Sequence, residues 1–191
     1  MASVTKPART RDPDAKRAAV LSAARRVFVR QGYAAASMAD VAREAGIAVG
    51  TIYRFFPAKI DLLRALHEAL ADAFIAAMRA AWADEGTYEA RLRRLVRSLF
   101  GLIRERRDEL RILAMTTDVG PGPVDRVRGC IAALAEEAMR DGAFRRMDPD
   151  HYAALVHGLV AGAMERHLRF GDDGTLEKTT EDMLCRAALR R

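Results

Sequence analysis

Residues 32–59 constrain the fold of this chain more than any other segment. Ser37 is a favoured N-cap residue and Asp40 stands three positions later, so the pair predicts a capping box at the start of a short helix. Gly46 ends this helix, because glycine takes the left-handed conformation of a helix C-terminus without a Cβ clash. A second helix is predicted over residues 49–56. Two short helices on a tight turn form a helix-turn-helix unit, which needs a third helix to complete its core.

The segment before this unit supplies the third helix. Residues 15–31 carry apolar side chains at helical spacing, and Asp14 precedes them as an N-cap. The predicted buried stripe comprises Val20, Leu21, Ala24, Val27 and Phe28. We therefore expect a three-helix domain over residues 14–58, with its helix-turn-helix at 37–56. Residues 1–13 contain two prolines and no periodicity, so they are expected to form a disordered basic tail.

Residues 32–59 resemble the DNA-binding segment of the tetracycline-repressor (TetR) family in residue type and spacing. The residues that match the family pattern, in order, are Gly32, Tyr33, Ser37, Met38, Asp40, Val41, Ala42, Ala45, Gly46, Ile47, Gly50, Thr51, Ile52, Tyr53, Phe56 and Lys59. Two positions depart from it: Ala48 stands where the family often has serine, and Ile60 where glutamate is frequent. The resemblance implies a homodimer that binds a palindromic operator in double-stranded DNA.

The same resemblance assigns roles to residues of the second short helix, whose N-terminus is expected to enter the major groove. Gly50 keeps the backbone close to the DNA. Thr51, Tyr53 and Lys59 correspond to phosphate contacts, which fix the register without reading sequence. Val49 is expected to read bases through thymine methyl groups.

Two further residues are candidates for DNA contact, each with an alternative role. Arg54 reads guanine or holds a phosphate, and Ser37 contacts a phosphate or serves as a helix cap alone. The distribution of charge favours a DNA-facing surface. The net charge is +6 at pH 7, and residues 1–56 hold ten basic and four acidic side chains, whereas the remainder holds 22 of each. The positive excess therefore lies in the predicted DNA-binding end, where lysine and arginine displace counterions from phosphates.

Residues 59–191 are expected to form a helical regulatory and dimerisation domain. Apolar residues recur there at helical spacing, and no stretch alternates in the manner of a strand. The predicted helices cover residues 59–84, 87–106, 108–115, 124–142, 149–170 and 176–187. With the three N-terminal helices they predict an all-α fold of about nine helices.

Ala154, Gly158 and Gly162 recur every four residues along the penultimate predicted helix. Such a stripe of small residues lets another helix approach closely, either inside the monomer or in a second subunit. We favour a dimer interface, because the family resemblance implies dimerisation through the last two helices. Met183 and Leu184 on the final helix are assigned to the same interface.

The resemblance also implies a largely apolar pocket for an unidentified small-molecule effector. The candidate lining residues are His67, Trp82, Tyr88, Met115, Thr116 and Cys130. The alternative for each of them is a role as an ordinary core or surface residue. The sequence does not name the effector.

Patterns of catalytic and metal sites are missing from the sequence. It lacks the Gly-x-Ser-x-Gly, Walker, Gly-x-Gly-x-x-Gly and His-Glu-x-x-His patterns, so we expect no enzyme activity, cofactor or metal. His157 and His167 are interpreted as core or interface histidines, and Cys130 and Cys185 as free thiols. No apolar run reaches the roughly 18 residues of a membrane span and no signal-peptide pattern is present, which favours a cytoplasmic protein without membrane contact.

The leading hypothesis is therefore a ligand-responsive, DNA-binding transcriptional regulator: a homodimeric repressor that a small molecule releases from its operator. The alternative is a ligand-independent architectural or cell-cycle DNA-binding protein on the same scaffold. A small helical enzyme is the least supported hypothesis, because no catalytic pattern is present.

Overall fold

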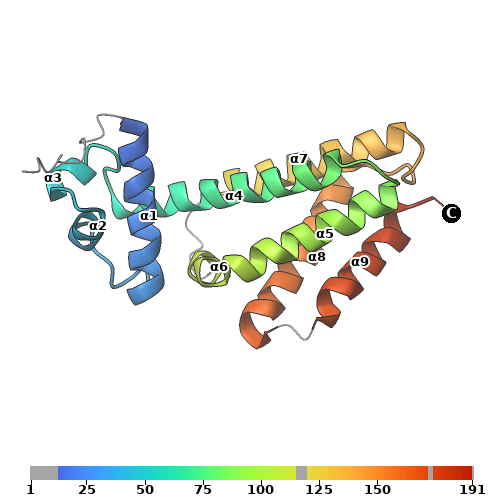
Figure 1. Ribbon diagram of the computed structural model, residues 1–191. Coiled ribbons are helices and arrows are strands. Elements are labelled where there is room, and N and C mark those ends of the chain that lie inside the picture. The colour runs from blue at the N-terminus through green and yellow to red at the C-terminus, as the bar shows by residue number, and fades with distance from the viewer. Residues whose placement is uncertain (1–12, 115–119, 172–173, 191) are drawn as a thin grey trace, which may run out of the picture. The chain divides into compact units, whose positions relative to one another are not determined.

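The computed structural model describes residues 13–114, 120–171 and 174–190. The chain divides into two compact units between Leu66 and His67, inside helix α4 (Lys59–Ala83). Within the described ranges the chain forms nine α-helices and, in place of a sheet, one isolated bridge between Phe144 and Leu189 (Figure 1). The predicted all-α fold is thereby confirmed. The tail predicted over residues 1–13 lies outside the described residues except for its last position.

The first unit contains α1 (Pro13–Gln31), α2 (Met38–Ala45), α3 (Val49–Ile52) and the start of α4. α1 packs against α2, and α2 packs against α3. The almost fully buried core side chains of this unit are Val20, Ala23, Ala24, Val27, Phe28, Val41, Ala42, Ile52, Phe56, Leu62 and Leu63. Leu21, which was predicted on the same face of α1, is only half-buried. The three-helix head is thus built around the apolar stripe of α1, as its spacing predicted.

The cap residues around the turn confirm the predicted start and end of α2. The Asp40 backbone N–H donates to the Ser37 hydroxyl at 3.1 Å, and the Ser37 backbone N–H donates to the Asp40 carboxylate at 3.1 Å. Gly46 follows the helix with a φ of 66°, a left-handed conformation that favours glycine. A capping box and a glycine stop therefore fix both ends of α2.

The second short helix is shorter than predicted. α3 ends at Ile52, and residues 53–55 form a turn instead of a continuing helix. The Arg54 and Phe55 backbone N–H groups bond to carbonyl oxygens three residues back, at 3.2 and 3.0 Å, which is the tighter 3₁₀ pattern. Pro57 follows and disfavours the α conformation of the residue before it. Tyr53 and Arg54 are consequently held by a turn.

The second unit combines the rest of α4 with α5 (Tyr88–Glu105), α6 (Arg107–Ala114), α7 (Gly122–Arg140), α8 (Pro149–Phe170) and α9 (Thr175–Ala188). α7 packs along α8, and α5 packs along α9 (Figure 1). Asp148 caps α8 by accepting the backbone N–H groups of the next turn, ahead of Pro149. The result is a helical bundle with its own apolar core.

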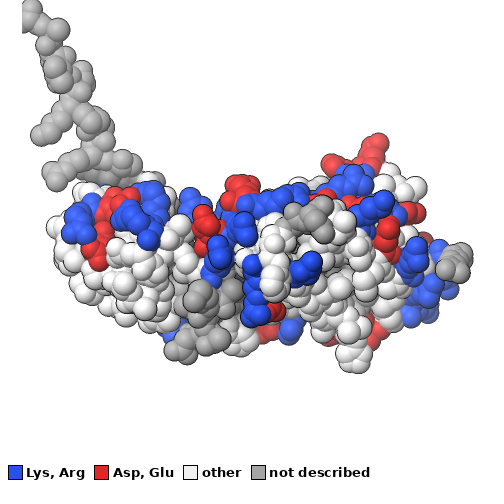
Figure 2. All heavy atoms as spheres, turned by 90° about the horizontal axis from the view of Figure 1, so that it is seen from below, with Lys and Arg blue, Asp and Glu red and all other residues white. Residues whose placement is uncertain are grey.

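Ion pairs join neighbouring helices at the surface of the second unit. Arg97 of α5 bonds to the buried carboxylate of Glu181 on α9 at 2.8 Å. Arg126 of α7 pairs with both Glu68 and Asp72 of α4. On the face drawn in Figure 2, lysine and arginine side chains lie beside aspartate and glutamate instead of forming a patch of one sign. These contacts hold the helices of the unit together.

Candidate nucleic-acid interface and effector cavity

α3 and the turn after it present most of the predicted DNA-contacting residues to solvent. Val49 and Tyr53 have 43% and 49% of their surface exposed, and Gly50 and Arg54 are exposed as well. Ile52 is fully buried and anchors α3 to the rest of the unit. An anchored helix with an exposed valine, tyrosine and arginine carries the groups that base and phosphate contacts require: a methyl surface, a hydroxyl and a guanidinium.

The N-terminus of α3 lacks a side-chain cap. Ala48 occupies the N-cap position with an extended backbone, and alanine has no oxygen with which to accept a hydrogen bond. The Thr51 backbone N–H donates to the Ala48 carbonyl oxygen at 2.8 Å, and Thr51 itself is half-buried. The departure of Ala48 from the family pattern thus has a local structural consequence.

Lys59 holds the loop before α2 in place. Its ammonium donates to the carbonyl oxygens of Tyr33, Ala34 and Ala36 at 2.8, 3.2 and 2.9 Å. It also lies 4.5 Å from the centroid of the Tyr33 ring. An ammonium has three N–H donors, and all three are used by these carbonyls. These bonds favour a structural role for Lys59 in this unit over the predicted phosphate contact.

Ser37 is also engaged inside the unit. Its hydroxyl donates to the Asp40 carboxylate at 2.6 Å, in addition to the capping-box bonds described above. These bonds from the Ser37 hydroxyl and backbone N–H, with a further one from Gln31, hold the pKa of Asp40 below its ordinary value. Of the two roles considered for Ser37, the structure favours the helix cap, because both of its donors are already used.

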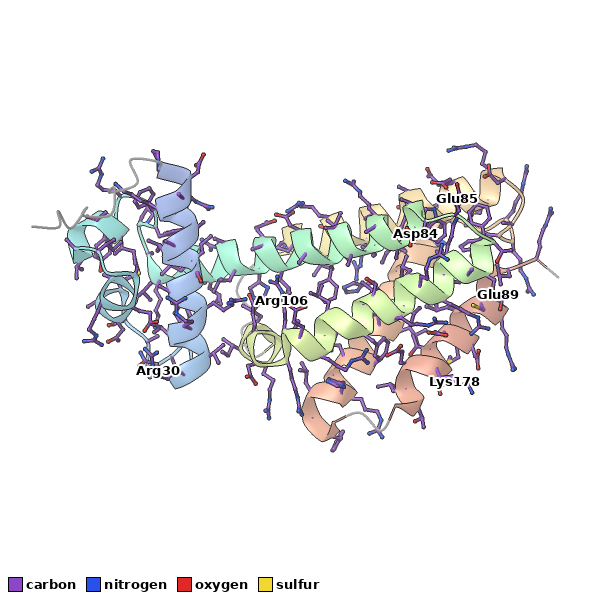
Figure 3. The ribbon with its side chains drawn as sticks, in the orientation of Figure 1. Arg30, Asp84, Glu85, Glu89, Arg106 and Lys178 are labelled. Atoms are coloured by element: carbon purple, nitrogen blue, oxygen red, sulfur yellow. The ribbon has the colours of Figure 1, made fainter. Side chains whose placement is uncertain are left out.

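Two arginines of α1 face an acidic residue of α2. Arg26 and Arg30 donate to the Glu44 carboxylate at 2.7 and 3.2 Å, with Arg30 projecting from the last turn of α1 (Figure 3). The bond from Arg26, followed by that from Arg30, lowers the pKa of Glu44. The count of basic side chains in residues 1–56 therefore overstates the charge available to phosphates. Sequence spacing did not indicate this bridge, because its partners lie 14 and 18 positions apart.

The second unit contains a partly open apolar cavity of about 240 Å³. His67 and Trp82, both predicted to line a pocket, lie on its wall. Met115 and Thr116 fall outside the described residues. His157 also lines the cavity, although the sequence suggested only a core or interface role. The sequence held a signal for this position. His157 lies seven residues before Met164, so the two residues share one face of the helix.

Two of the predicted lining residues are absent from the described wall of this cavity. The Tyr88 hydroxyl donates to the Asp141 carboxylate at 2.5 Å, which raises the pKa of Tyr88 to about 12, and its ring packs against Trp82 at 5.7 Å between centroids. Cys130 is buried but faces a separate hollow lined by Asp72, Arg79 and their neighbours. The described lining of this cavity therefore favours their alternative role as ordinary core or surface residues.

The last two helices carry several exposed apolar and small residues. Leu155 and Phe170 of α8 are 76% and 74% exposed, and Met183 of α9 is 53% exposed. Ala154, Gly158 and Gly162 are exposed on α8. Leu184 is the exception among the predicted interface residues. It is buried in the core and lines the cavity, because one step along a helix turns a side chain by about 100°.

A helix-turn-helix head with an exposed second helix, carried by an all-α chain, defines the class of the protein as a DNA-binding transcriptional regulator. The family model described as bacterial regulatory proteins, tetR family, matches residues 20–66. The matched segment covers most of α1 together with α2, α3 and the start of α4. In the described residues no helix has the length and apolar character that a bilayer crossing requires.

Named relatives agree with this class. The HTH-type transcriptional activator FasR of Mycolicibacterium smegmatis is 29% identical over 154 residues, which are 78% of this chain and 68% of FasR. The HTH-type transcriptional repressor LfrR of the same organism is 37% identical over 86 residues, which are 45% of this chain and 44% of LfrR. This alignment thus spans less than half of LfrR.

Solved structures show the same fold over nearly the whole chain. The structure of SmeT, described as the repressor of the Stenotrophomonas maltophilia multidrug efflux pump SmeDEF, matches with a TM-score of 0.76. The match covers 91% of this chain and 90% of SmeT at 21% identity. At this identity the likeness concerns the fold and carries no information on the ligand.

Proposed function

We propose that the protein is a homodimeric transcriptional repressor that binds a palindromic operator and is released by a small molecule. The observation that carries the proposal is the pairing, in one chain, of an exposed α3 surface with an apolar cavity in a separate helical unit. Val49, Thr51, Tyr53 and Arg54 are the proposed DNA-contacting side chains, and Gly50 keeps the backbone near the DNA. The proposed place of action is the cytoplasm, where a bacterial operator lies.

The exposed face of α8 and α9 supports the dimer. Single exposed apolar residues are common on protein surfaces, but three large ones on two helices, one of which also carries a stripe of small residues, favour a protein contact. A two-fold dimer presents two α3 helices to two half-sites of opposite orientation. Half-sites one helical turn apart require the two helices to be separated by roughly 34–36 Å or a multiple of it.

Release follows from different affinities of the ligand for two arrangements of the dimer. In one of these forms the two α3 helices do not fit the two half-sites. A ligand that binds this form more tightly lowers the fraction of the dimer that can bind DNA. The cavity favours this scheme over the ligand-independent architectural alternative, because a protein that binds no ligand does not require an apolar cavity of this size.

Selection from random duplexes tests the DNA part of the proposal without knowledge of the ligand. The full-length chain is incubated with a random-sequence library at low salt, and bound duplexes are sequenced. We expect two inverted half-sites whose centres are about 10 base pairs or a multiple apart. Enrichment of a single unrepeated motif, or of none, contradicts the palindrome.

The direction of regulation is tested separately by transcription in vitro from the selected operator placed over a promoter. Repression predicts fewer transcripts when the protein is added. An increase in transcripts would make the protein an activator, as FasR is named.

A further inference from the structure

The cavity of the second unit has very few polar groups on its wall. Among its described lining residues none is lysine, arginine, aspartate or glutamate. The groups that can form hydrogen bonds there are His67 of α4, His157 of α8, Trp82 and Tyr152. The indole N–H of Trp82 is already used, because it donates to Glu137 at 3.1 Å. The cavity therefore offers a ligand apolar contact and a small number of neutral hydrogen-bonding groups.

His67 is the polar group that most clearly needs a ligand. Its Nε2 atom is buried and has no hydrogen-bond partner among the described residues. A buried nitrogen without a partner costs free energy, because it has lost water and gained nothing in exchange. A ligand oxygen placed against Nε2 would remove that cost and fix the orientation of the ligand.

Both histidines are held neutral by their surroundings. Burial lowers the pKa of His67, and burial with the nearby Arg128 lowers the pKa of His157. A neutral imidazole has one donor and one acceptor nitrogen, so it suits a hydroxyl, carbonyl or amide group. It supplies no charge to balance an ion, and an unbalanced ion in an apolar site is strongly disfavoured.

We infer that this cavity binds an uncharged, largely apolar molecule bearing a hydrogen-bonding oxygen, with His67 as the polar anchor for that oxygen. The inference rests on the proposed function only in taking the cavity as the effector site. It deepens that function by assigning the chemical class of the effector. At about 240 Å³ the cavity is near the small end of the usual range for ligand sites, so a chain of about ten carbons is a suitable probe.

Trp82 makes the test direct. It is the one tryptophan in the sequence, and it lies on the cavity wall, so intrinsic fluorescence reports on occupancy. The full-length protein is titrated at pH 7.5 with three probes of equal chain length: 1-decanol, decanoate and decylammonium. We expect a saturable fluorescence change with 1-decanol and binding at least about ten-fold weaker for the two ions. Equal or tighter binding of either ion, or no saturation with 1-decanol, overturns the inference.

A variant separates the anchor role of His67 from a merely structural one. His67→Leu keeps the cavity apolar and should weaken 1-decanol binding about ten-fold, while leaving the affinity for butylbenzene, which has no oxygen, unchanged. His151→Leu alters an exposed histidine of the same helix bundle and should change neither affinity. Equal losses for both probes in His67→Leu would show a packing defect and contradict the anchor.

Failure of this inference and failure of the proposed function are distinguishable. Tight binding of an ion overturns the assigned chemical class of the effector. It does not contradict the proposal that a ligand releases the protein from DNA. The selection from random duplexes uses no ligand, so a missing palindrome overturns the proposed repressor whatever the fluorescence titrations give.

Discussion

Lys59 and Tyr33 form the contact that fixes the loop in front of the helix-turn-helix. The Lys59 ammonium lies 4.5 Å from the centroid of the Tyr33 ring and donates to the Tyr33 carbonyl oxygen at 2.8 Å. The Tyr33 ring packs against the buried Phe28 ring in a T-shaped arrangement, with centroids 5.3 Å apart. One lysine from the start of α4 therefore connects the α1–α2 loop to the core that carries α3.

This role predicts the effect of Lys59→Met. Three carbonyl oxygens lose their donor, so the free energy of unfolding should fall by about 1–3 kcal/mol, measured by urea denaturation followed by circular dichroism. Lys16→Met, at an exposed position of α1, is the matched control and should change stability little. The slope of log affinity for DNA against log salt should stay unchanged in Lys59→Met. A slope reduced by about 1, at an unchanged free energy of unfolding, would instead show that Lys59 contacts a phosphate.

The uncapped N-terminus of α3 predicts a stabilising substitution. Ala48→Ser places an oxygen at an N-cap whose backbone is already extended, where it can accept an N–H of the first turn. The free energy of unfolding of the head should rise by about 0.5–2 kcal/mol, measured by the same denaturation. Ala35→Ser, an exposed alanine in the preceding loop, serves as the control. If Ala48→Ser is no more stable than this control, the missing cap does not limit the stability of α3.

Val49 and Tyr53 are predicted to differ in the kind of DNA contact they make. Val49→Ala should change base preference at one position of each half-site by about 1–3 kcal/mol, because it removes a methyl contact. Tyr53→Ala should weaken binding to all sequences by a similar factor, because a phosphate contact carries no sequence information. Selection from random duplexes with each variant distinguishes the two effects, and the reverse pattern would exchange the assigned roles.

The exposed α8 face predicts a variant that separates the subunits without unfolding them. A Cβ added at Gly158 meets no other group among the described residues, so Gly158→Leu should fold normally but clash with a second helix packed against the stripe. Sedimentation velocity should show monomers for this variant and dimers for the parent chain. Gly129→Leu on α7, where a Cβ is also free of contacts, should remain dimeric. A dimeric Gly158→Leu protein would place the interface elsewhere.

Local features of the fold were predictable from the sequence, and long-range contacts were not. Ser37, Asp40 and Gly46 act within one or two turns of chain, so their residue types were sufficient to predict both ends of α2. The carbonyl partners of Lys59 could not be predicted, because they lie 23 to 26 positions earlier, a distance at which spacing carries no signal.

The surface assignments show the same limit at the level of single residues. Periodicity placed an apolar face on α9, but only packing distinguishes the exposed Met183 from the buried Leu184. The sequence likewise indicated a pocket between helices without deciding its wall. His67 and Trp82 line the cavity and Tyr88 does not, because its hydroxyl is engaged by Asp141.

The most direct measurement of DNA binding is sedimentation of a labelled duplex from the protein's own promoter region, titrated with the full-length chain at low ionic strength. The predicted result is a complex whose mass corresponds to two protomers, or a multiple of two, per duplex, and whose affinity falls steeply as salt is added. A duplex that sediments alone at every protein concentration, at low salt and with correctly folded protein, would contradict the claim that the α1–α3 head binds DNA.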